Sequence, residues 1–348
     1  MRSAARGRRV KAWCTMDRIR KYTLGELAAL LPFPDKDANK YTRGKLTIVA
    51  GSDRFPGACA LAALASQRMG AGYTDVLCAP EAVPVVRVSA PSLTVRSWKE
   101  LLSYAEKDPD ERDAGAFGVT RARTGAVTGQ VGLSILSDAV VDRPSVFAPS
   151  RDGHPTAYLV GPGFVPDAPE SAALANAVLS EAQAPVLIDG GGLSALATPE
   201  ARLTLRRRFI DGCPTVVTPH AGEAARLAAP LKLATDDPAR LAWLISLAYG
   251  VVAMVKGPVT YVSDGDRVVR MADGTPALAK AGTGDVLAGM AAALLAQGLD
   301  PVDACVLAST LHARAARHAA KRLTEICVTA EDVVAFVPEA VRLLAKEA

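Results

Sequence analysis

Short apolar runs alternate with longer Ala-rich stretches of helical periodicity from residue 45 to the end of the chain. The apolar runs predict buried strands at 45–50, 74–78, 158–160, 185–188, 215–217 and 251–255. The other stretches predict helices at 58–69, 83–88, 169–182, 199–208, 237–249, 285–297, 301–320 and 330–345. This alternation indicates βα units, so we expect an α/β fold with a mainly parallel central sheet flanked by helices. A polar turn at 264–266 predicts a hairpin over 261–271.

Three segments fall outside this alternation. Residues 22–31 predict a short helix that Thr23 caps. Residues 1–20 are basic and predict a disordered extension, in which Met16 is a second candidate start. Residues 100–156 contain a run of charges and many Gly and Thr residues, and we expect a loop insertion or lid there. One domain is then expected over 21–348.

Composition narrows the class of protein. The chain has 348 residues, half of them apolar and 22% charged, which suits one large α/β domain. Its net charge of +4 is mild and much of the positive charge lies in residues 1–22, so we expect no nucleic-acid partner. Six scattered cysteines without a C-x-x-C pair indicate reduced thiols. With no secretory signal and no bilayer-length apolar run, we expect a cytoplasmic protein without a membrane partner.

Turns that contain Gly or Pro follow several of the predicted strands. They lie at 50–57, 161–163, 189–192, 218–222 and 256–258. In an open parallel sheet the turns at the carboxyl ends of the strands meet along one edge, where ligands bind. We therefore expect these turns to share one cleft with the stretch 281–289.

Residues 281–290, AGTGDVLAGM, place a turn of small residues directly before an apolar helix. Gly282 and Gly284 permit backbone angles closed to other residues and let a phosphate approach the main chain. The first N–H groups of the helix have no intrahelical partner and bind anions. Asp285 has two interpretations: an N-cap carboxylate, or a general base that accepts a proton as phosphate is transferred. The local motif leaves both open.

Five groups of residues occur together in one known family. They are Val49-Ala50-Gly51-Ser52 with Pro56-Gly57-Ala58, Val160-Gly161-Pro162-Gly163, Thr218-Pro219-His220-Ala221-Gly222-Glu223, Lys256-Gly257-Pro258-Val259-Thr260 and the stretch 281–289. With them the chain resembles the NAD(P)H-hydrate dehydratases of the ribokinase-like superfamily, from about residue 23 to 345 apart from 100–156. Many kinases of the superfamily share 281–289, whereas 218–223 combined with the other turns is more specific to the dehydratases.

The resemblance implies a reaction and its cofactors. The family acts on NADH or NADPH that has taken up water on the nicotinamide ring. It uses ADP or ATP to phosphorylate the added hydroxyl, and elimination of phosphate restores NAD(P)H, so the enzyme is a lyase. Magnesium is expected to bridge the phosphates. We also expect a separate epimerase that acts on the same metabolite and, by analogy with bacterial relatives, a homo-oligomer, specifically a tetramer.

The same resemblance implies roles for individual residues. Asp285 is the catalytic base and touches the hydrate. The pocket for the hydrated nicotinamide is lined by Ala58, Gly163, His220 and Asp285. The nucleotide lies along Lys256, Gly257, Pro258, Val259, Thr260, Gly282, Thr283 and Gly284. No residue is assigned as a metal ligand, and Lys256 would also fit a solvated lysine.

Plainer roles stay open for other polar residues. His220 also fits a surface or cap histidine. Glu223 fits a first-turn helix carboxylate or a contact to magnesium through water. Asp189 either helps in the phosphate region or caps the next segment. His312 and His318 fall on an Ala-rich helix, where packing or solvent roles are expected.

Two turns depart from the family pattern. Residues 161–165, GPGFV, lack the third glycine of Gly-Pro-Gly-Leu-Gly. Residues 189–193, DGGGL, lack the second aspartate of Asp-Ala-Asp-(Ala/Gly)-Leu. Two alternatives therefore stay open: a vitamin-precursor kinase of the same fold that stops at the phosphate ester, and a catalytically degenerate nucleotide-binding protein. The sequence does not decide between ADP and ATP.

Overall fold

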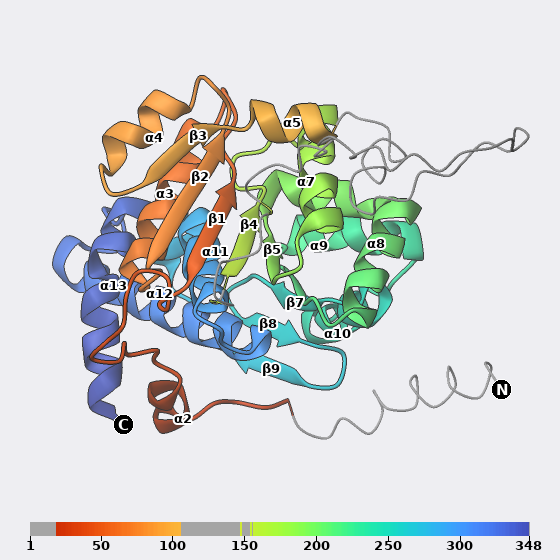
Figure 1. Cartoon of the computed structure of the whole chain (residues 1–348). Helices are drawn as coiled ribbons and strands as arrows, with labels where there is room; N and C mark the ends of the chain where they lie inside the picture. The colour runs from red at the N-terminus through yellow and green to blue at the C-terminus, as the bar shows by residue number, and fades with distance from the viewer. Residues whose placement is uncertain (1–18, 106–146, 148–153, 155, 348) are drawn as a thin grey trace, which may run out of the picture.

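The computed structural model describes residues 19–105, 147, 154 and 156–347, and in these residues nine strands form one sheet (Figure 1). The strand order is β3-β2-β1-β4-β5-β6-β7-β8-β9. The strands are β1 Lys45–Val49, β2 Tyr73–Cys78, β3 Thr94–Ser97, β4 Thr156–Val160, β5 Val186–Ile188, β6 Thr215–Val217, β7 Val252–Val255, β8 Thr260–Ser263 and β9 Val268–Met271. Strands β1 to β7 pair in parallel, and only β8 and β9 pair antiparallel. The predicted mainly parallel sheet is confirmed.

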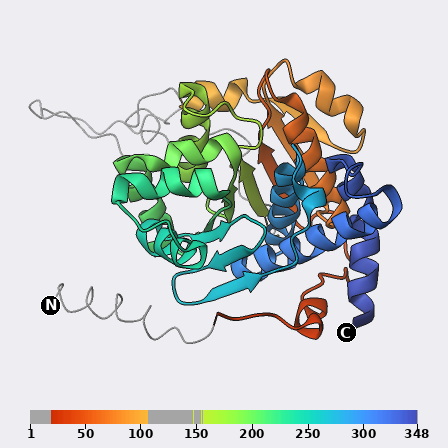
Figure 2. The same ribbon diagram turned by 180° about the vertical axis from the view of Figure 1, so that it is seen from behind.

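Helices cover both faces of the sheet, as the front and rear views show (Figures 1 and 2). One face carries α3 Pro56–Arg68, α4 Val83–Ser89, α11 Thr283–Ala296, α12 Pro301–Leu323 and α13 Ala330–Leu344. The other carries α5 Lys99–Ala105, α7 Pro169–Glu181, α8 Pro199–Ile210, α9 Ala221–Ala228 and α10 Pro238–Tyr249. Because both faces are covered, the parallel strands are continuous apolar runs rather than alternating ones, and β4 to β7 are buried almost throughout.

The chain reverses its direction of travel across the sheet at β1. It runs outward from β1 through β2 to β3, and returns to form β4 on the other side of β1. The carboxyl ends of β1 and β4 therefore border a topological switch point, the usual ligand site of an open α/β sheet. The two turns there are joined, because Gly51 N donates to Pro162 O at 2.8 Å and Ser52 Oγ donates to Gly163 O at 2.7 Å.

Helix α11 is the central helix of its face and is buried along nearly its whole length. It packs closely on α3, since a Cβ on Gly289 would lie 2.1 Å from Ala62 O. Its N-cap is Gly282, with a φ of 89° that favours glycine. This packing holds the first turn of α11 at the carboxyl edge of the sheet.

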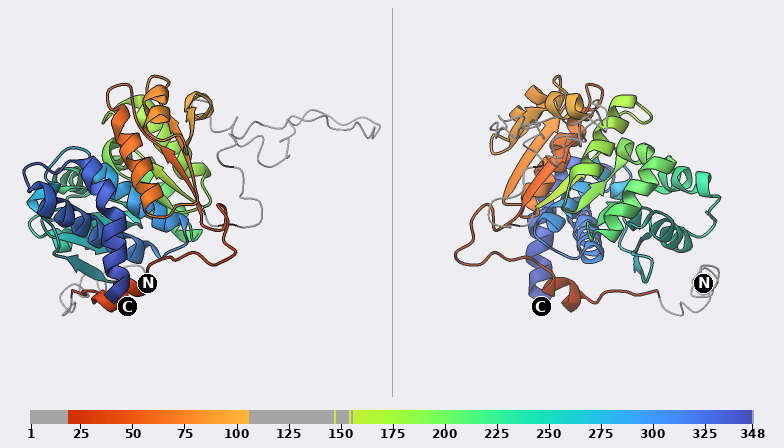
Figure 3. Two further views of the ribbon diagram at one scale, coloured as in Figure 1. Left: turned by 90° about the vertical axis from the view of Figure 1, so that its left-hand side faces the viewer. Right: turned by 45° about the vertical axis from the view of Figure 1, so that its right-hand side comes forward.

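The first described residues run along the outer edge of the sheet. Arg20 pairs with β9, because its N–H donates to Val268 O at 2.9 Å and its carbonyl accepts from Arg270 N at 3.0 Å. The next helix, α2 Leu24–Ala29, lies beside the C-terminal end of α13 (Figure 3). Residues 1–18, most of the predicted extension, lie outside the described residues.

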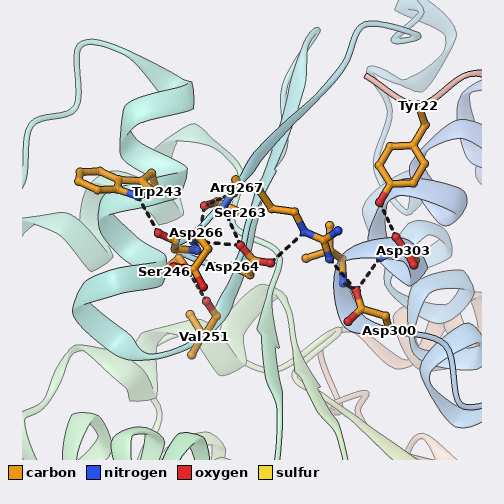
Figure 4. A network of polar contacts seen from close by, with 12 residues as sticks. Tyr22, Trp243, Ser246, Val251, Ser263, Asp264, Asp266, Arg267, Asp300 and Asp303 are labelled. Carbon is orange, nitrogen blue, oxygen red and sulfur yellow. Dashed lines mark hydrogen bonds and ion pairs between the residues drawn. The ribbon is translucent and has the colours of Figure 1, made fainter. Parts of the chain in front are cut away.

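A polar network ties the β8–β9 hairpin to its surroundings (Figure 4). Arg267 bonds to Asp264 at 2.9 Å and to Asp300 at 3.0 Å. Tyr22 donates its hydroxyl hydrogen to Asp303, and burial together with this bond raises the pKa of Tyr22 to about 12. The start of α12 is thus connected both to the hairpin, through Arg267, and to the N-terminal segment, through Tyr22.

Most predicted elements match the structure to within a few residues, including the hairpin and the helix capped by Thr23. Strand β3 and helix α5 were not predicted. The prediction of a glycine turn at 189–192 is wrong in part, because a 3₁₀ helix, η3 Gly190–Ala197, begins there. The predicted insertion or lid falls mainly on 106–146 and 148–153, outside the described residues. No helix in the described part of the chain is long and apolar enough to cross a membrane.

Candidate active site

The structure brings the predicted turns together at the carboxyl edge of the sheet. The turns after β1 and β4 share the hydrogen bonds at the switch point. The turn after β6 is bonded to the strand end of β7, since Lys256 N donates to Pro219 O at 2.8 Å. The turns after β5 and β6 are joined through Thr218 and Asp189. These turns therefore meet along one edge, but the single cleft expected for all of them with 281–289 is not seen, because only 218–222 and 256–258 among the turns contribute residues to the cavity described below.

Gly163 and Ala58 lie against each other at the switch point. A Cβ on Gly163 would lie 2.6 Å from Phe55 O and 2.8 Å from Ala58 Cβ, and the φ of Gly163 is +71°. Only glycine fits such a position. A residue larger than alanine at 58 would fill the same space, so the wall between β1 and β4 is made of backbone and small side chains.

A buried ion pair connects the ends of β5 and β7. Lys256 Nζ donates to Asp189 Oδ1 at 2.6 Å, and Thr218 Oγ1 donates to the same oxygen at 2.6 Å. Burial by itself would lower the pKa of Lys256, but the carboxylates of Asp189 and Glu223 raise it above its usual value. The lysine is therefore a fixed positive charge, and its alternative role as a solvated lysine is wrong.

The same lysine lies beside the start of α11. A Cβ on Gly284 would be 3.6 Å from Lys256 Nζ. The first turn of α11 presents backbone N–H groups without intrahelical partners. An ammonium group next to these N–H groups makes a site for a phosphate.

Asp285 is the third residue of α11, two positions after the first helical residue, Thr283. The N-cap is Gly282 and no side chain caps this helix, so the interpretation of Asp285 as an N-cap carboxylate is wrong. Burial, with the negative charges of Asp189 and Glu223, raises the pKa of Asp285 to about 7 against the opposing charge of Lys256. A carboxylate with this pKa can take up a proton at neutral pH.

His220 and Glu223 form a capping box at the start of α9. His220 Nδ1 accepts from Gly222 N at 3.0 Å, and Glu223 Oε2 accepts from His220 N at 2.8 Å. Burial raises the pKa of Glu223. The plainer roles are thus present: His220 is a cap histidine and Glu223 a first-turn carboxylate. The other ring nitrogen, Nε2, lies 3.5 Å from Glu223 Oε1, and the side chain is 62% exposed, so a ligand can contact the ring from its solvent side.

A cavity of about 520 Å³ opens between the end of β7 and helices α11 and α12. The charged Lys256 and the backbone of Gly284 belong to its lining, as do the apolar side chains of Met271, Leu278 and Leu287. Its lining includes His220, Lys256, Gly257, Pro258, Thr260, Thr283, Gly284, Ser309, His312 and the 273–276 segment. A nucleotide needs this combination of an anion site and an apolar slot for its base.

The structure separates the predicted site residues into two groups. Six of the predicted nucleotide residues line the cavity, whereas Val259 and Gly282 do not. Ala58 and Gly163 lie apart from it at the switch point, and His220 lines the cavity itself. Residues 273–279 and the α12 side chains were not predicted, because no local motif distinguishes them from an ordinary loop and an ordinary Ala-rich helix.

The two departures from the family pattern lie against each other. A Cβ on Gly191 would be 2.3 Å from Phe164 O and 2.9 Å from Phe164 Cβ, so no larger residue fits at 191. Phe164 is buried and packs edge-on against Trp98 with ring centres 5.5 Å apart. The acidic group absent from 191 is therefore replaced by packing, and Asp189 is the carboxylate that this turn supplies.

The acidic side chains of the site determine how it could hold a magnesium ion. Within the described ranges no three His, Cys, Asp or Glu side chains could together hold a metal ion. Magnesium usually keeps several waters and binds one or two carboxylates together with substrate phosphates. Glu223 and Asp285 are two such carboxylates, and the charge of Glu223 is close enough to raise the pKa of Asp285. The residues therefore fit a magnesium ion that arrives on nucleotide phosphates.

Comparisons with known sequences all relate the chain to one family. The sequence model of a family described as NAD(P)H-hydrate dehydratase matches residues 46–119 and 134–339. The bifunctional NAD(P)H-hydrate repair enzyme Nnr of Salinibacter ruber is 34% identical, over 92% of this chain and 52% of the relative. The ADP-dependent (S)-NAD(P)H-hydrate dehydratase of Xanthomonas campestris is 30% identical, over 93% of this chain and 96% of the relative. The chain thus spans about half the length of the bifunctional relative and nearly all of the single dehydratase.

Comparisons with solved structures show the fold. The ADP/ATP-dependent NAD(P)H-hydrate dehydratase of Bacillus subtilis, crystallised with ATP and Mg²⁺, has a TM-score of 0.71 and 24% identity, covering 94% of this chain and 99% of that one. A ribokinase-like superfamily protein of Enterococcus faecalis has a TM-score of 0.68 and 20% identity, covering 94% and 97%. The expected ribokinase-like fold is confirmed.

Proposed function

Because the chain belongs to the NAD(P)H-hydrate dehydratase family, we propose that it returns hydrated NADH or NADPH to NAD(P)H at the expense of ADP or ATP. The observation that carries this proposal is the meeting of Asp285 and Lys256 at the first turn of α11. Asp285 has a pKa that suits a base at neutral pH, and Lys256 is a fixed cation beside an anion site.

In the proposed reaction Asp285 accepts the proton of the hydroxyl that water added to the nicotinamide ring. The hydroxyl oxygen forms a bond to the terminal phosphorus of the nucleotide, and the bond from that phosphorus to the bridging oxygen breaks. AMP leaves from ADP, or ADP leaves from ATP. Loss of phosphate from the ring, together with a proton from the neighbouring ring carbon, then re-forms the carbon–carbon double bond, so that the products are NAD(P)H, phosphate and the shorter nucleotide.

Each group on this chain contributes one task. Lys256, held by Asp189, and the N–H groups at the start of α11 bind the transferred phosphoryl group and stabilise its charge. Lys256, Gly257, Pro258, Thr260, Thr283 and Gly284 line the cavity and would border the nucleotide. Magnesium, when bound, neutralises charge on the phosphates, and Glu223 and Asp285 are the carboxylates that would face it.

The hydrate is proposed to bind at the switch point. Ala58 and Gly163 leave room there for a flat ring to approach the backbone, and His220 supplies a polar contact from the start of α9. Asp285 lies between this wall and the nucleotide cavity in the proposal, since it must reach the hydroxyl. The cytoplasmic location, the homo-oligomer and the separate epimerase remain parts of the same proposal.

Recovery of absorbance at the reduced-nicotinamide band tests the function directly. Hydrated NADH is mixed with the full chain, Mg²⁺ and either ADP or ATP, and the proposal expects recovery together with release of phosphate. A phosphorylated product that accumulates without recovery would identify a kinase of the same fold instead. No turnover of either nucleotide would identify a nucleotide-binding protein without catalysis.

A further inference from the structure

Asp273 lies between β9 and the 3₁₀ helix η5 Pro276–Leu278, and it lines the nucleotide cavity. Among the described residues that line this cavity, it is the one with a carboxylate. Its side chain is 46% exposed, so a ligand in the cavity can reach the carboxylate oxygens. The proposed reaction gives this group no task, and the sequence did not predict it.

Two neighbours hold Asp273 in the cavity wall. Arg317 of α12 donates from Nη1 to Asp273 Oδ1 at 3.3 Å and from Nη2 to Gly274 O at 3.5 Å. On the other side a Cβ on Gly274 would lie 2.4 Å from Pro258 O, so the segment packs directly on the loop after β7. Arg317 uses one oxygen of the carboxylate. Since an ionised carboxylate accepts about four hydrogen bonds, Asp273 keeps capacity for a ligand.

The carboxylate does not suit the phosphates of a nucleotide. Phosphate oxygens are negatively charged acceptors, and a second negative acceptor repels them. The charges that shift the pKa of Asp285 belong to Asp189, Glu223 and Lys256, and Asp273 is not among them. Asp273 therefore lies outside the charged group at the first turn of α11, where the transferred phosphate is proposed to bind.

The donors on an adenosine group decide what Asp273 can bind. Adenine presents its 6-amino donor beside the acceptor N7, and that acceptor repels an ionised carboxylate. Ribose presents two adjacent hydroxyl donors, which match the two oxygens of a carboxylate. Asp and Glu bind ribose hydroxyls in this way in dinucleotide-binding folds. The sugar is therefore the better partner for an exposed carboxylate.

Taking the proposed use of ADP or ATP as given, we propose that Asp273 is a specificity-determining residue whose carboxylate accepts hydrogen bonds from the 2′- and 3′-hydroxyls of the nucleotide's ribose. Arg317 is the positioning residue that holds this carboxylate. A 2′-deoxynucleotide loses one of the two charge-assisted bonds. The site therefore selects ribonucleotides over deoxyribonucleotides.

Calorimetric titration of the full chain with ADP, 2′-deoxy-ADP and IDP, each with Mg²⁺, measures this selectivity. The wild-type chain should bind ADP about tenfold more tightly than 2′-deoxy-ADP, the usual size of one hydrogen bond to a charged group. IDP keeps the ribose and differs from ADP only in the base. The ratio of ADP to IDP affinity should therefore not depend on Asp273.

Three variants separate the hydrogen bonds from the fold of the cavity wall. In Asp273→Ala the ratio of ADP to 2′-deoxy-ADP affinity should fall to about one. Asp273→Asn keeps an uncharged acceptor and should restore part of the ratio. Arg317→Met leaves the carboxylate without its support and should lower the ratio in part. The matched control is Glu339→Ala, because Glu339 is a 39% exposed carboxylate in an arginine ion pair outside the cavity, and it should leave the ratio unchanged.

The remaining outcomes contradict the inference. Equal binding of ADP and 2′-deoxy-ADP by the wild-type chain, or an unchanged ratio in Asp273→Ala, would overturn it. An equal loss of affinity for all three nucleotides in Asp273→Ala would show a structural role instead. A change in the ratio of ADP to IDP alone would place the carboxylate against the base. Absorbance recovery with wild-type chain and ADP separates these results from failure of the proposed function, whereas binding of none of the nucleotides would overturn both.

Discussion

Lys256 Nζ lies 2.6 Å from Asp189 Oδ1, and the pair joins two strand ends directly below the first turn of α11. Both side chains are largely buried, so the charge of each is compensated mainly by the other. The aspartate has a second effect, because its negative charge also raises the pKa of Asp285. The carboxylate of Asp189 thus holds Lys256 in place and also raises the pKa of Asp285.

Replacing Asp285 tests its role as the proton acceptor. Asp285→Asn keeps the shape of the side chain but cannot accept a proton, so turnover of the hydrate should fall by about 10²–10⁴ or to background. The affinity for ADP, measured by titration, should survive because Lys256 and the start of α11 remain. Turnover close to that of the wild type would remove Asp285 from its assigned role.

The neighbours of Asp285 should shift the pH dependence in opposite directions. The proposed base must be ionised, so kcat/KM should rise with pH to a plateau, with a midpoint close to pH 7. Asp189→Asn removes a negative charge, which lowers the pKa of Asp285 and moves this limb to lower pH. Lys256→Met removes the positive charge and moves the limb to higher pH. Shifts of the same sign in both variants would contradict this arrangement.

Asp285 should also make stability depend on pH. Its pKa is raised in the folded chain, so its contribution to stability is present below the unfolded pKa and is lost as pH rises from there through about 7. Asp285→Asn removes that loss. The variant should therefore gain stability over the wild type between pH 5 and pH 8, by on the order of 2 kcal/mol from about 1.4 kcal/mol per pKa unit. Urea unfolding at the two pH values measures the gain, and a constant difference would show that burial does not perturb this carboxyl.

His220 has a cap role and a proposed ligand role that two variants can separate. His220→Ala removes both, at a cost of about 1 kcal/mol for the cap. His220→Asn keeps an N-cap acceptor but loses the ring. We expect both variants to raise KM for the hydrate more than KM for ADP, and only His220→Ala to lower the melting temperature. His220 lines the nucleotide cavity, so equal effects on both KM values would place the ring against the nucleotide instead.

Gly191 should tolerate no side chain. Gly191→Ala drives a Cβ to within 2.3 Å of Phe164 O, and relief of this overlap must move the turn that carries Asp189. We expect a loss of stability of about 1–3 kcal/mol or more in chemical denaturation. Gly25→Ala is the control, because Gly25 lies in α2 with nothing within 4 Å of its Cβ position, and helix propensity should make that change neutral or favourable. A stable Gly191→Ala variant would show that 164 and 191 are not packed together.

The sequence predicts the strands and turns of the central sheet well because burial on both faces makes each parallel strand a continuous apolar run. Strand β3 escapes this signal. It has only four residues, and Arg96 within it is accommodated by an ion pair of 2.7 Å with the buried Asp75 of β2. A charged residue that a neighbouring strand compensates cannot be recognised from its own segment.

The candidate site likewise contains residues that the sequence identifies and residues that only the structure identifies. Asp285 and the glycines before it belong to one contiguous motif, and the sequence identifies the motif, though only the structure assigns the N-cap to Gly282. Asp189 acts through partners on distant segments, Thr218 and Lys256. Its surroundings depend on which strand ends meet, and this does not follow from local periodicity.

The pairing of Arg20 with β9 has a practical consequence for handling the protein. β9 is the last strand of the sheet, and Arg20 covers part of its open hydrogen-bonding side. An uncovered outer strand is a template on which another molecule's chain can add. A recombinant version trimmed to begin after Arg20, or one whose purification tag pulls that residue away, should therefore tend to form insoluble assemblies.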